Sequence, residues 1–212
     1  MSASCCQTAP RFDGLSAGFK RVLWAVIAIN ATMFAVEVAA GALAGSQALW
    51  ADALDFLGDT MTYGITLLVL GQPQRVRSAA ALFKGLSMAV MGLWVFGTTA
   101  YQTLILGVPQ AEVMGAVAML ALAANLGCLL LLLRYREGDA NVRSVWLCSR
   151  NDVIGNVAVL LAAGAVWLTS SAWPDLIVAA LMAGLFLWSA LQITRQALQE
   201  WRHSAAPLEA AE

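Results

Sequence analysis

Three aspartates in one apolar stretch are the residues of this sequence best suited to chemistry. Asp52, Asp55 and Asp59 lie in an apolar run from about Gln47 to Leu70 that holds no other charged side chain. On a helix, their spacings of three and four residues place the three carboxylates on one face. An ionised aspartate near the middle of a bilayer costs roughly 2.5–3.5 kcal/mol, so such residues usually mark an ion or substrate pathway. We expect this stripe to bind a cation. The alternative is a helix end whose aspartates lie in water beside the lipid headgroups.

A second polar stripe lies near the start of the fifth apolar run. Cys148, Asp152 and Asn156 follow one another at intervals of four residues and share a helical face. The pair Cys148 and Asp152 repeats the spacing of Asp55 and Asp59, 93 residues further along the chain. Because three helices separate the pairs, the second is inverted relative to the first, which is how several transporters form a site between two repeats. The spacing suggests 3+3 inverted halves, although little other identity links them.

The composition indicates an all-α integral membrane protein. The chain has 212 residues, of which 60% are hydrophobic and 12% charged, and its mean hydropathy is +0.74. This leaves room for about six transmembrane helices of ~20 residues or more and for no second soluble domain. A net charge of -1 gives no sign of a nucleic-acid partner. We expect a polar tail (1–20), a six-helix transporter domain (21–197) and a short tail (198–212), with spans at about 21–43, 46–71, 79–106, 111–133, 144–169 and 174–194.

The positive charges predict the orientation in the membrane. With six spans, all 12 Lys and Arg residues fall on one side, within residues 1–21, 72–84, 134–150 and 195–212, which are the tails, the loops after the second and fourth spans and the adjoining helix ends. The positive-inside rule then places both termini in the cytoplasm, and we expect the cell (inner) membrane as the location. Lys84 lies about a turn inside the third span, and its side chain is long enough to extend the ammonium group to the same surface.

Two parts of the chain resemble the cation diffusion facilitator family. The segment from Asn30 to Glu37, followed by residues 41–59, is similar to the first two helices of that family, and residues 148–156 are similar to its fifth. In the family, a His or Asp and an Asp four residues later, in each of helices two and five, hold a metal ion. The resemblance therefore implies a transporter, with no catalytic residue and no prosthetic group. The metal ligands that it implies are Asp55, Asp59, Cys148 and Asp152.

The sequence departs from the family pattern in three ways. Cys148 stands where the family usually has His or Asp, so the metal preference of better-known members does not carry over. There is no histidine-rich loop, and His203 in the C-terminal tail is the only histidine. We expect no cytosolic C-terminal domain after the sixth span, so a homodimer would form through the membrane helices.

The chemistry of these ligands predicts the cargo and its coupling. Three carboxylates and a thiolate suit tetrahedral zinc, and the thiolate favours zinc, cadmium or cobalt over magnesium or calcium. If Cys148 only packs as a small apolar residue, manganese and iron(II) return as candidates. Carboxylates gathered in an apolar bundle cannot all stay ionised without a cation, so metal binding should release protons. We expect export of the metal from the cytoplasm in exchange for protons, by alternating access.

Three more polar residues and two other functions remain open. Asp52 is either a charge in a vestibule or an acceptor behind the ligands, and Asn156 either orients the site or links helices. Glu37 either forms a hydrogen bond within the bundle or belongs to a proton path.

A membrane-embedded, Mg²⁺-dependent lipid-headgroup transferase is the main alternative function, but the basic and glycine pattern of those enzymes is missing after Asp52. A scaffold without transport would leave the buried acids unexplained.

Overall fold

A computed structural model of the chain describes residues 16–69, 72–105, 107–135 and 140–205. These residues contain no β-strand, which confirms the all-α prediction. They form six α-helices and one short 3-10 helix: α1 (Ala17–Ala44), α2 (Gln47–Val69), α3 (Gln74–Ile105), α4 (Ala111–Leu132), η1 (Leu133–Tyr135), α5 (Ala140–Thr169) and α6 (Trp173–Ala205).

The helices follow the predicted spans, and two of them extend well beyond. Helix α3 begins at Gln74, before the predicted start near residue 79, and α6 continues to Ala205. Hydropathy marks only the part of a helix that lies in lipid, whereas the helix itself continues until a residue stops it. Pro73 directly precedes α3, and its carbonyl accepts a hydrogen bond from the N–H of Val76 (3.0 Å). Beyond residue 194, the residues of α6 are mostly good helix formers, so nothing ends the helix at the lipid boundary.

The outer surface of the helices is apolar, as expected for a surface in contact with lipid. Helices α1, α3, α4, α5 and α6 each contain a segment long and apolar enough to cross a membrane, as judged by length and composition. Large apolar side chains point outward: Trp24, Leu104 and Leu168 are 62%, 82% and 76% exposed. An apolar surface of this extent needs lipid around it. The remaining helix, α2, carries the three aspartates and packs against α1, α3, α5 and α6, so its polar residues have protein neighbours. The chain is a multi-pass membrane protein.

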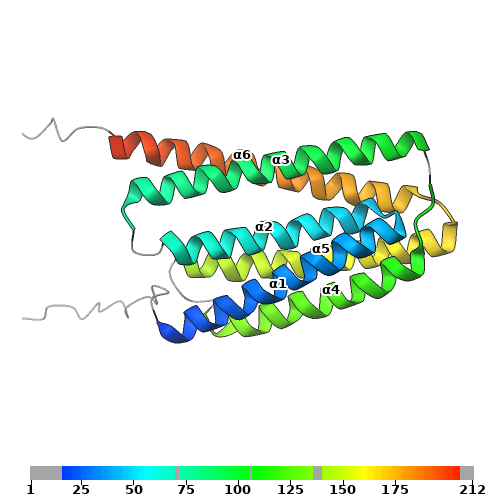
Figure 1. The fold of residues 1–212 in the computed structure, drawn as a ribbon, viewed down its shortest axis with the longest axis horizontal. Helices are drawn as coiled ribbons and strands as arrows, with labels where there is room; N and C mark the ends of the chain where they lie inside the picture. Colours follow the sequence, from blue (N-terminus) through cyan, green and yellow to red (C-terminus); the bar gives the residue numbers. More distant parts are fainter. Residues whose placement is uncertain (1–15, 70–71, 106, 136–139, 206–212) are drawn as a thin grey trace, which may run out of the picture.

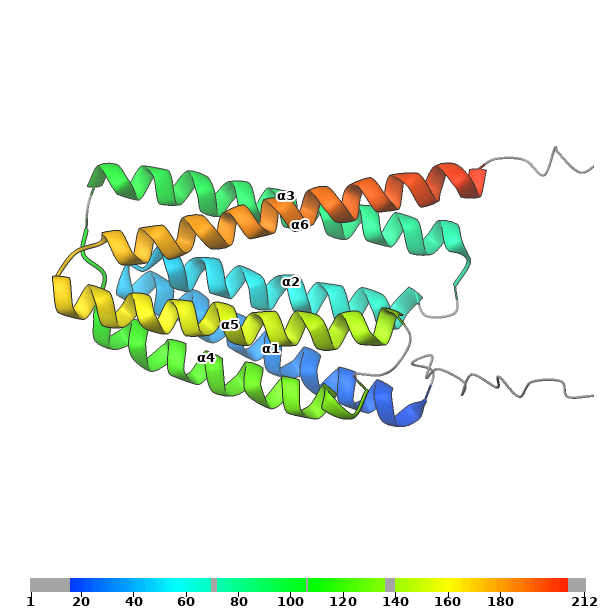
Figure 2. The same cartoon turned by 180° about the vertical axis from the view of Figure 1, so that it is seen from behind.

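The bundle has two parts (Figures 1 and 2). Helices α3 and α6 pack along each other on one side, and α1, α2, α4 and α5 form the other part. Helices that follow one another in sequence run in opposite directions, so the start of α1 and the end of α6 lie at the same end of the bundle (Figure 1). Each helix of the first half contacts its counterpart in the second: α1 with α4, α2 with α5, and α3 with α6. Two inverted halves would give this pairing, although the repeat itself stays a prediction.

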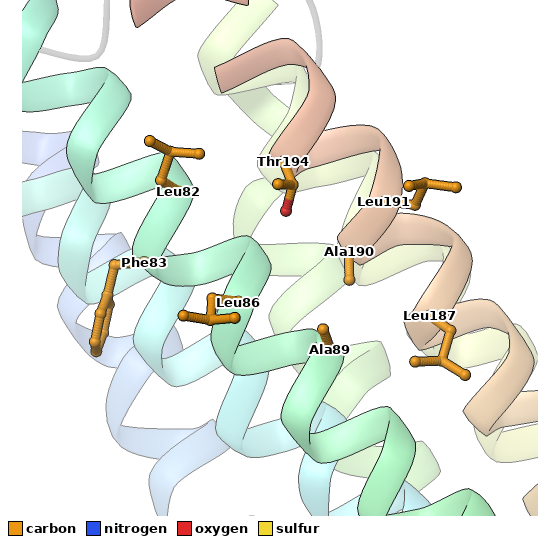
Figure 3. A pocket seen from close by; sticks show the side chains of 8 residues that line it. All are labelled: Leu82, Phe83, Leu86, Ala89, Leu187, Ala190, Leu191 and Thr194. Atoms are coloured by element: carbon orange, nitrogen blue, oxygen red, sulfur yellow. The ribbon is translucent and has the colours of Figure 1, made fainter. Parts of the chain in front are cut away.

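Small residues allow α3 and α6 to approach closely. A Cβ atom added to Gly92 would lie 3.0 Å from the Cγ atom of Leu187, and one added to Gly85 would collide with the Thr194 hydroxyl. A pocket opens along the same two helices (Figure 3). Its lining offers one hydroxyl and no acid, histidine or cysteine, so it is not the predicted metal site. The lining residues are Leu82, Phe83, Leu86, Ala89, Leu187, Ala190, Leu191 and Thr194.

A buried carboxylate ties the start of α6 to the start of α2. Gly45 ends α1 in the left-handed conformation (φ 66°), which glycine adopts without strain. Asp175, 1% exposed in the first turn of α6, then accepts three hydrogen bonds. The donors are the Ser46 hydroxyl (2.6 Å) and the backbone N–H groups of Gln47 (2.8 Å) and Ala48 (3.0 Å). Asp175 therefore satisfies N–H groups that the first turn of a helix leaves unpaired. We call this contact the Asp175 clamp.

Candidate metal site

The antiparallel packing of α2 and α5 brings the two polar stripes together. Asn156 donates a hydrogen bond from Nδ2 to Oδ1 of Asp52 (3.4 Å), which fixes the register of the two helices. Because the helices run in opposite directions, moving four residues back along α5 from Asn156 corresponds to moving about four residues forward along α2 from Asp52. Asp152 of α5 and Asp55 of α2 therefore lie at about the same height in the bundle.

Three carboxyl groups meet at this level. The Asp152 carboxyl lies close enough to those of Asp55 and Asp59 to form a hydrogen bond with each. All three side chains are half-buried. An ionised carboxylate can only accept hydrogen bonds, so two carboxyl groups in such contact must share a proton or hold a cation between them. The packing of α2 and α5 therefore brings together carboxyl groups of the kind that bind cations and protons.

The fourth predicted ligand is Cys148. Its backbone belongs to α5, one turn before Asp152, and the register places this turn at about the level of Asp59. The Cys148 side chain, however, lies outside the described part of the structure. Among the side chains that the structure describes, no three of the His, Cys, Asp or Glu type are placed so that they could hold a metal ion together. The ligand set of Asp55, Asp59, Cys148 and Asp152 stays a prediction.

Asp52 and Asn156 lie on the deep side of these carboxyl groups. Asp52 is 1% exposed and Asn156 is fully buried. Besides its bond to Asp52, Asn156 donates from Nδ2 to the backbone carbonyl of Asp152 (2.9 Å). Asn156 therefore links α5 to α2, and Asp52 accepts its hydrogen bond in the interior of the bundle.

Glu37 extends the acidic cluster onto α1. It is fully buried and lies near enough to Asp52 and Asp55 to interact with both electrostatically. The Glu37 carboxyl also lies within hydrogen-bonding reach of the Asp52 carboxyl. This contact agrees with the expectation of a hydrogen bond within the bundle. Two carboxyl groups in such contact must share a proton or hold a cation between them, and the role of Glu37 in a proton path stays a prediction.

Two further residues near the carboxyl groups were not singled out from the sequence as part of the site. Tyr63, one turn after Asp59 on α2, is fully buried and within hydrogen-bonding reach of the Asp59 carboxylate. Its four-residue spacing from Asp59 continues the acidic stripe and could have revealed it. Lys84 on α3 exerts an electrostatic attraction on Asp59. No local pattern shows this, because it depends on how α3 is placed beside α2.

Comparison with known proteins identifies the family. Residues 23–200 match the model of the cation efflux transmembrane domain. The chain therefore belongs to the cation efflux family, also called cation diffusion facilitators, as the resemblance implied.

Several curated relatives match most of the chain. The metal cation efflux system protein CzcD of Cupriavidus metallidurans is 29% identical over 183 residues, which cover 81% of this chain and 57% of CzcD. The zinc transporter ZitB of Yersinia pestis is 30% identical over 194 residues, covering 85% of this chain and 62% of ZitB. ZitB of Pectobacterium atrosepticum is 31% identical over 198 residues, with coverages of 87% and 62%. The chain thus spans about three fifths of the length of these relatives.

Proposed function

We propose that the chain is a secondary transporter that exports divalent transition-metal cations from the cytoplasm in exchange for protons. The observation that carries the proposal is the meeting of the Asp152 carboxyl with those of Asp55 and Asp59 inside a membrane bundle. Membership of the cation efflux family and the names of the relatives support it. Zinc is the first candidate for the cargo. Cadmium and cobalt follow because a Cys148 thiolate would favour soft or borderline metals.

The ligand chemistry gives the coupling. Metal ligands must be deprotonated, so a divalent cation arriving from the cytoplasm displaces protons from the carboxyl groups. Once the bundle faces the other side, protons from outside compete with the metal for the same oxygens and release it. A bound divalent cation offsets the repulsion among Asp55, Asp59 and Asp152 in one half of the cycle, and bound protons offset it in the other half.

The orientation and the oligomeric state belong to the same proposal. Both described ends of the chain lie at one end of the bundle, and the positive residues of the sequence are predicted to lie there, which supports cytoplasmic termini in the inner membrane (Figure 1). A homodimer would form through the lipid-facing helices, whose outer faces are apolar.

The transferase alternative has less support. It would use the aspartates to hold Mg²⁺ for chemistry on a lipid headgroup. The family match concerns cation efflux, and a Cys148 ligand would disfavour Mg²⁺.

Transport into proteoliposomes tests the proposal. Vesicles that contain a zinc-sensitive dye and purified protein should take up Zn²⁺ when a pH gradient is imposed, and Asp59→Ala should abolish the uptake. Glu112→Ala is the matched control, because Glu112 is an exposed acid in the first turn of α4, far along the chain from both stripes. If Asp59→Ala takes up Zn²⁺ as fast as the wild type, the proposed metal site is wrong. If Zn²⁺ uptake is the same with and without a pH gradient, proton exchange is wrong.

A further inference from the structure

Lys84 is a positive charge on the side of α3 that faces α2. Residues 84 and 95 are eleven positions apart, or three helical turns plus about 20°, so they lie on nearly the same face of α3. Val95 is fully buried and packs in one cluster with Ala48, Leu49 and Ala51 of α2. Lys84 itself is half-buried. A lysine whose ammonium group only contacts lipid headgroups could lie on the lipid-facing side of α3, whereas Lys84 lies near the side that packs against α2.

The register of α2 and α3 places Lys84 at the level of Asp59. The rings of Trp50 on α2 and Trp94 on α3 pack edge to face, with centroids 5.4 Å apart. From this contact, Asp59 lies nine residues further along α2, and Lys84 lies ten residues back along the antiparallel α3. At 1.5 Å per residue these steps are about 14 and 15 Å, so the two residues lie at almost the same height in the bundle. The electrostatic attraction between Lys84 and Asp59 agrees with this placement.

We propose that Lys84 sets the charge of the metal site: its ammonium group offsets part of the negative charge of Asp55, Asp59 and Asp152, and it repels the divalent cargo that binds them. This inference rests on the proposed function, because it needs a metal ion at the three carboxyl groups. Lys84 is a positioning charge and not a ligand, since an ammonium group has no lone pair to give a metal.

The physical consequence is a lower affinity of the site for the metal ion. Three carboxylates and a thiolate bind zinc tightly, whereas a transporter must also release its cargo. A fixed positive charge near the site lowers the affinity by Coulomb repulsion, and in a partly buried site this repulsion is much less screened than in water. Lys84 would therefore keep the affinity low enough for release on the far side of the membrane.

Metal affinity of the full chain in detergent, measured with Zn²⁺ and a competing chromophoric chelator at pH 8, tests the inference. Competition from protons is smaller at this pH than at pH 7. Lys84→Gln should bind Zn²⁺ about tenfold more tightly than the wild type or tighter still, because the repulsion is lost. Lys84→Arg keeps the charge and should stay close to the wild type. Lys20→Gln is the control, because Lys20 is an exposed lysine at the start of α1.

The outcomes separate the inference from the proposed function. If Asp59→Asn binds Zn²⁺ as the wild type does, the metal site itself is wrong. If Asp59→Asn loses binding while Lys84→Gln matches the wild type, the site stands and the role of Lys84 is wrong. An equal change in Lys84→Arg and Lys84→Gln would also overturn the inference, because the effect would then come from side-chain shape. Should Lys84→Gln fail to fold, Lys84→Met gives the same comparison with a side chain of similar length and no charge.

Discussion

Removal of the Asp175 clamp should strongly destabilise this bundle. The carboxylate accepts hydrogen bonds from the Ser46 hydroxyl and from the N–H groups of Gln47 and Ala48 in a buried environment. Hydrogen bonds to a charged group contribute about 1.5–3 kcal/mol each, and a buried donor left without a partner costs about 1–3 kcal/mol. The Ser46 Oγ atom would still accept from the N–H of Leu49 (3.0 Å), so part of the helix cap survives. We therefore expect Asp175→Ala to lower the free energy of unfolding by roughly 3–5 kcal/mol.

Thermal unfolding of the purified protein in detergent would measure this loss. A destabilisation of this size corresponds to a fall in the unfolding temperature on the order of 10 °C. Asp175→Asn keeps one acceptor oxygen and loses the charge, so its loss should be about half as large. Glu112→Ala removes an exposed acid from the first turn of α4 and should stay within about 0.5 kcal/mol of the wild type. The reasoning fails if Asp175→Ala unfolds at the same temperature as Glu112→Ala.

Three further predictions concern the interior and the cargo. Asn156→Ala should destabilise the protein by about 1–3 kcal/mol in the same assay, because Asp52 loses the hydrogen bond that links α2 to α5; an unchanged unfolding temperature would show that this bond contributes nothing. Gly92→Ala should destabilise by about 1–3 kcal/mol, because its Cβ would press against Leu187, whereas Gly97→Ala has open space and should be neutral or stabilising by up to about 1 kcal/mol; equal effects would contradict the close packing of α3 on α6. The affinity for Zn²⁺ should rise with pH, by up to about tenfold per pH unit for each proton released, and calorimetry in buffers of different ionisation enthalpy would count those protons; an affinity independent of pH would exclude proton release.

The helices were predictable from the sequence because their cause is local. An apolar run of about twenty residues must form a helix in lipid, where the backbone has to satisfy its own hydrogen bonds, and each predicted run became one helix. The prediction missed the extensions of α3 and α6, since hydropathy does not register polar residues that continue a helix outside the membrane. The acidic stripe marked α2 as unlike the other spans, and the structure gives it protein neighbours on several sides.

The candidate site was predictable only in part. The spacings of Asp52, Asp55 and Asp59 on one helix and of Asp152 and Asn156 on another identified the two stripes, and the structure brings these stripes into contact. Whether a metal ion closes the site is still a prediction, because the Cys148 side chain lies outside the described residues. The sequence could not show whether Asp52 is buried in the bundle or lies in an open vestibule, because its spacing from Asp55 on the helix is the same in both cases.

What the sequence by itself determined is therefore the set of helices, the polar face of each and the family to which the motifs point. Periodicity fixes which residues share a face of one helix, and composition fixes that the helices lie in lipid. Only the tertiary structure decided that Asp175 caps α2 and that Lys84 stands level with Asp59. Those contacts depend on which helices are neighbours and on their rotation and register, and these follow from packing across the whole bundle, such as the fit of Gly92 against Leu187.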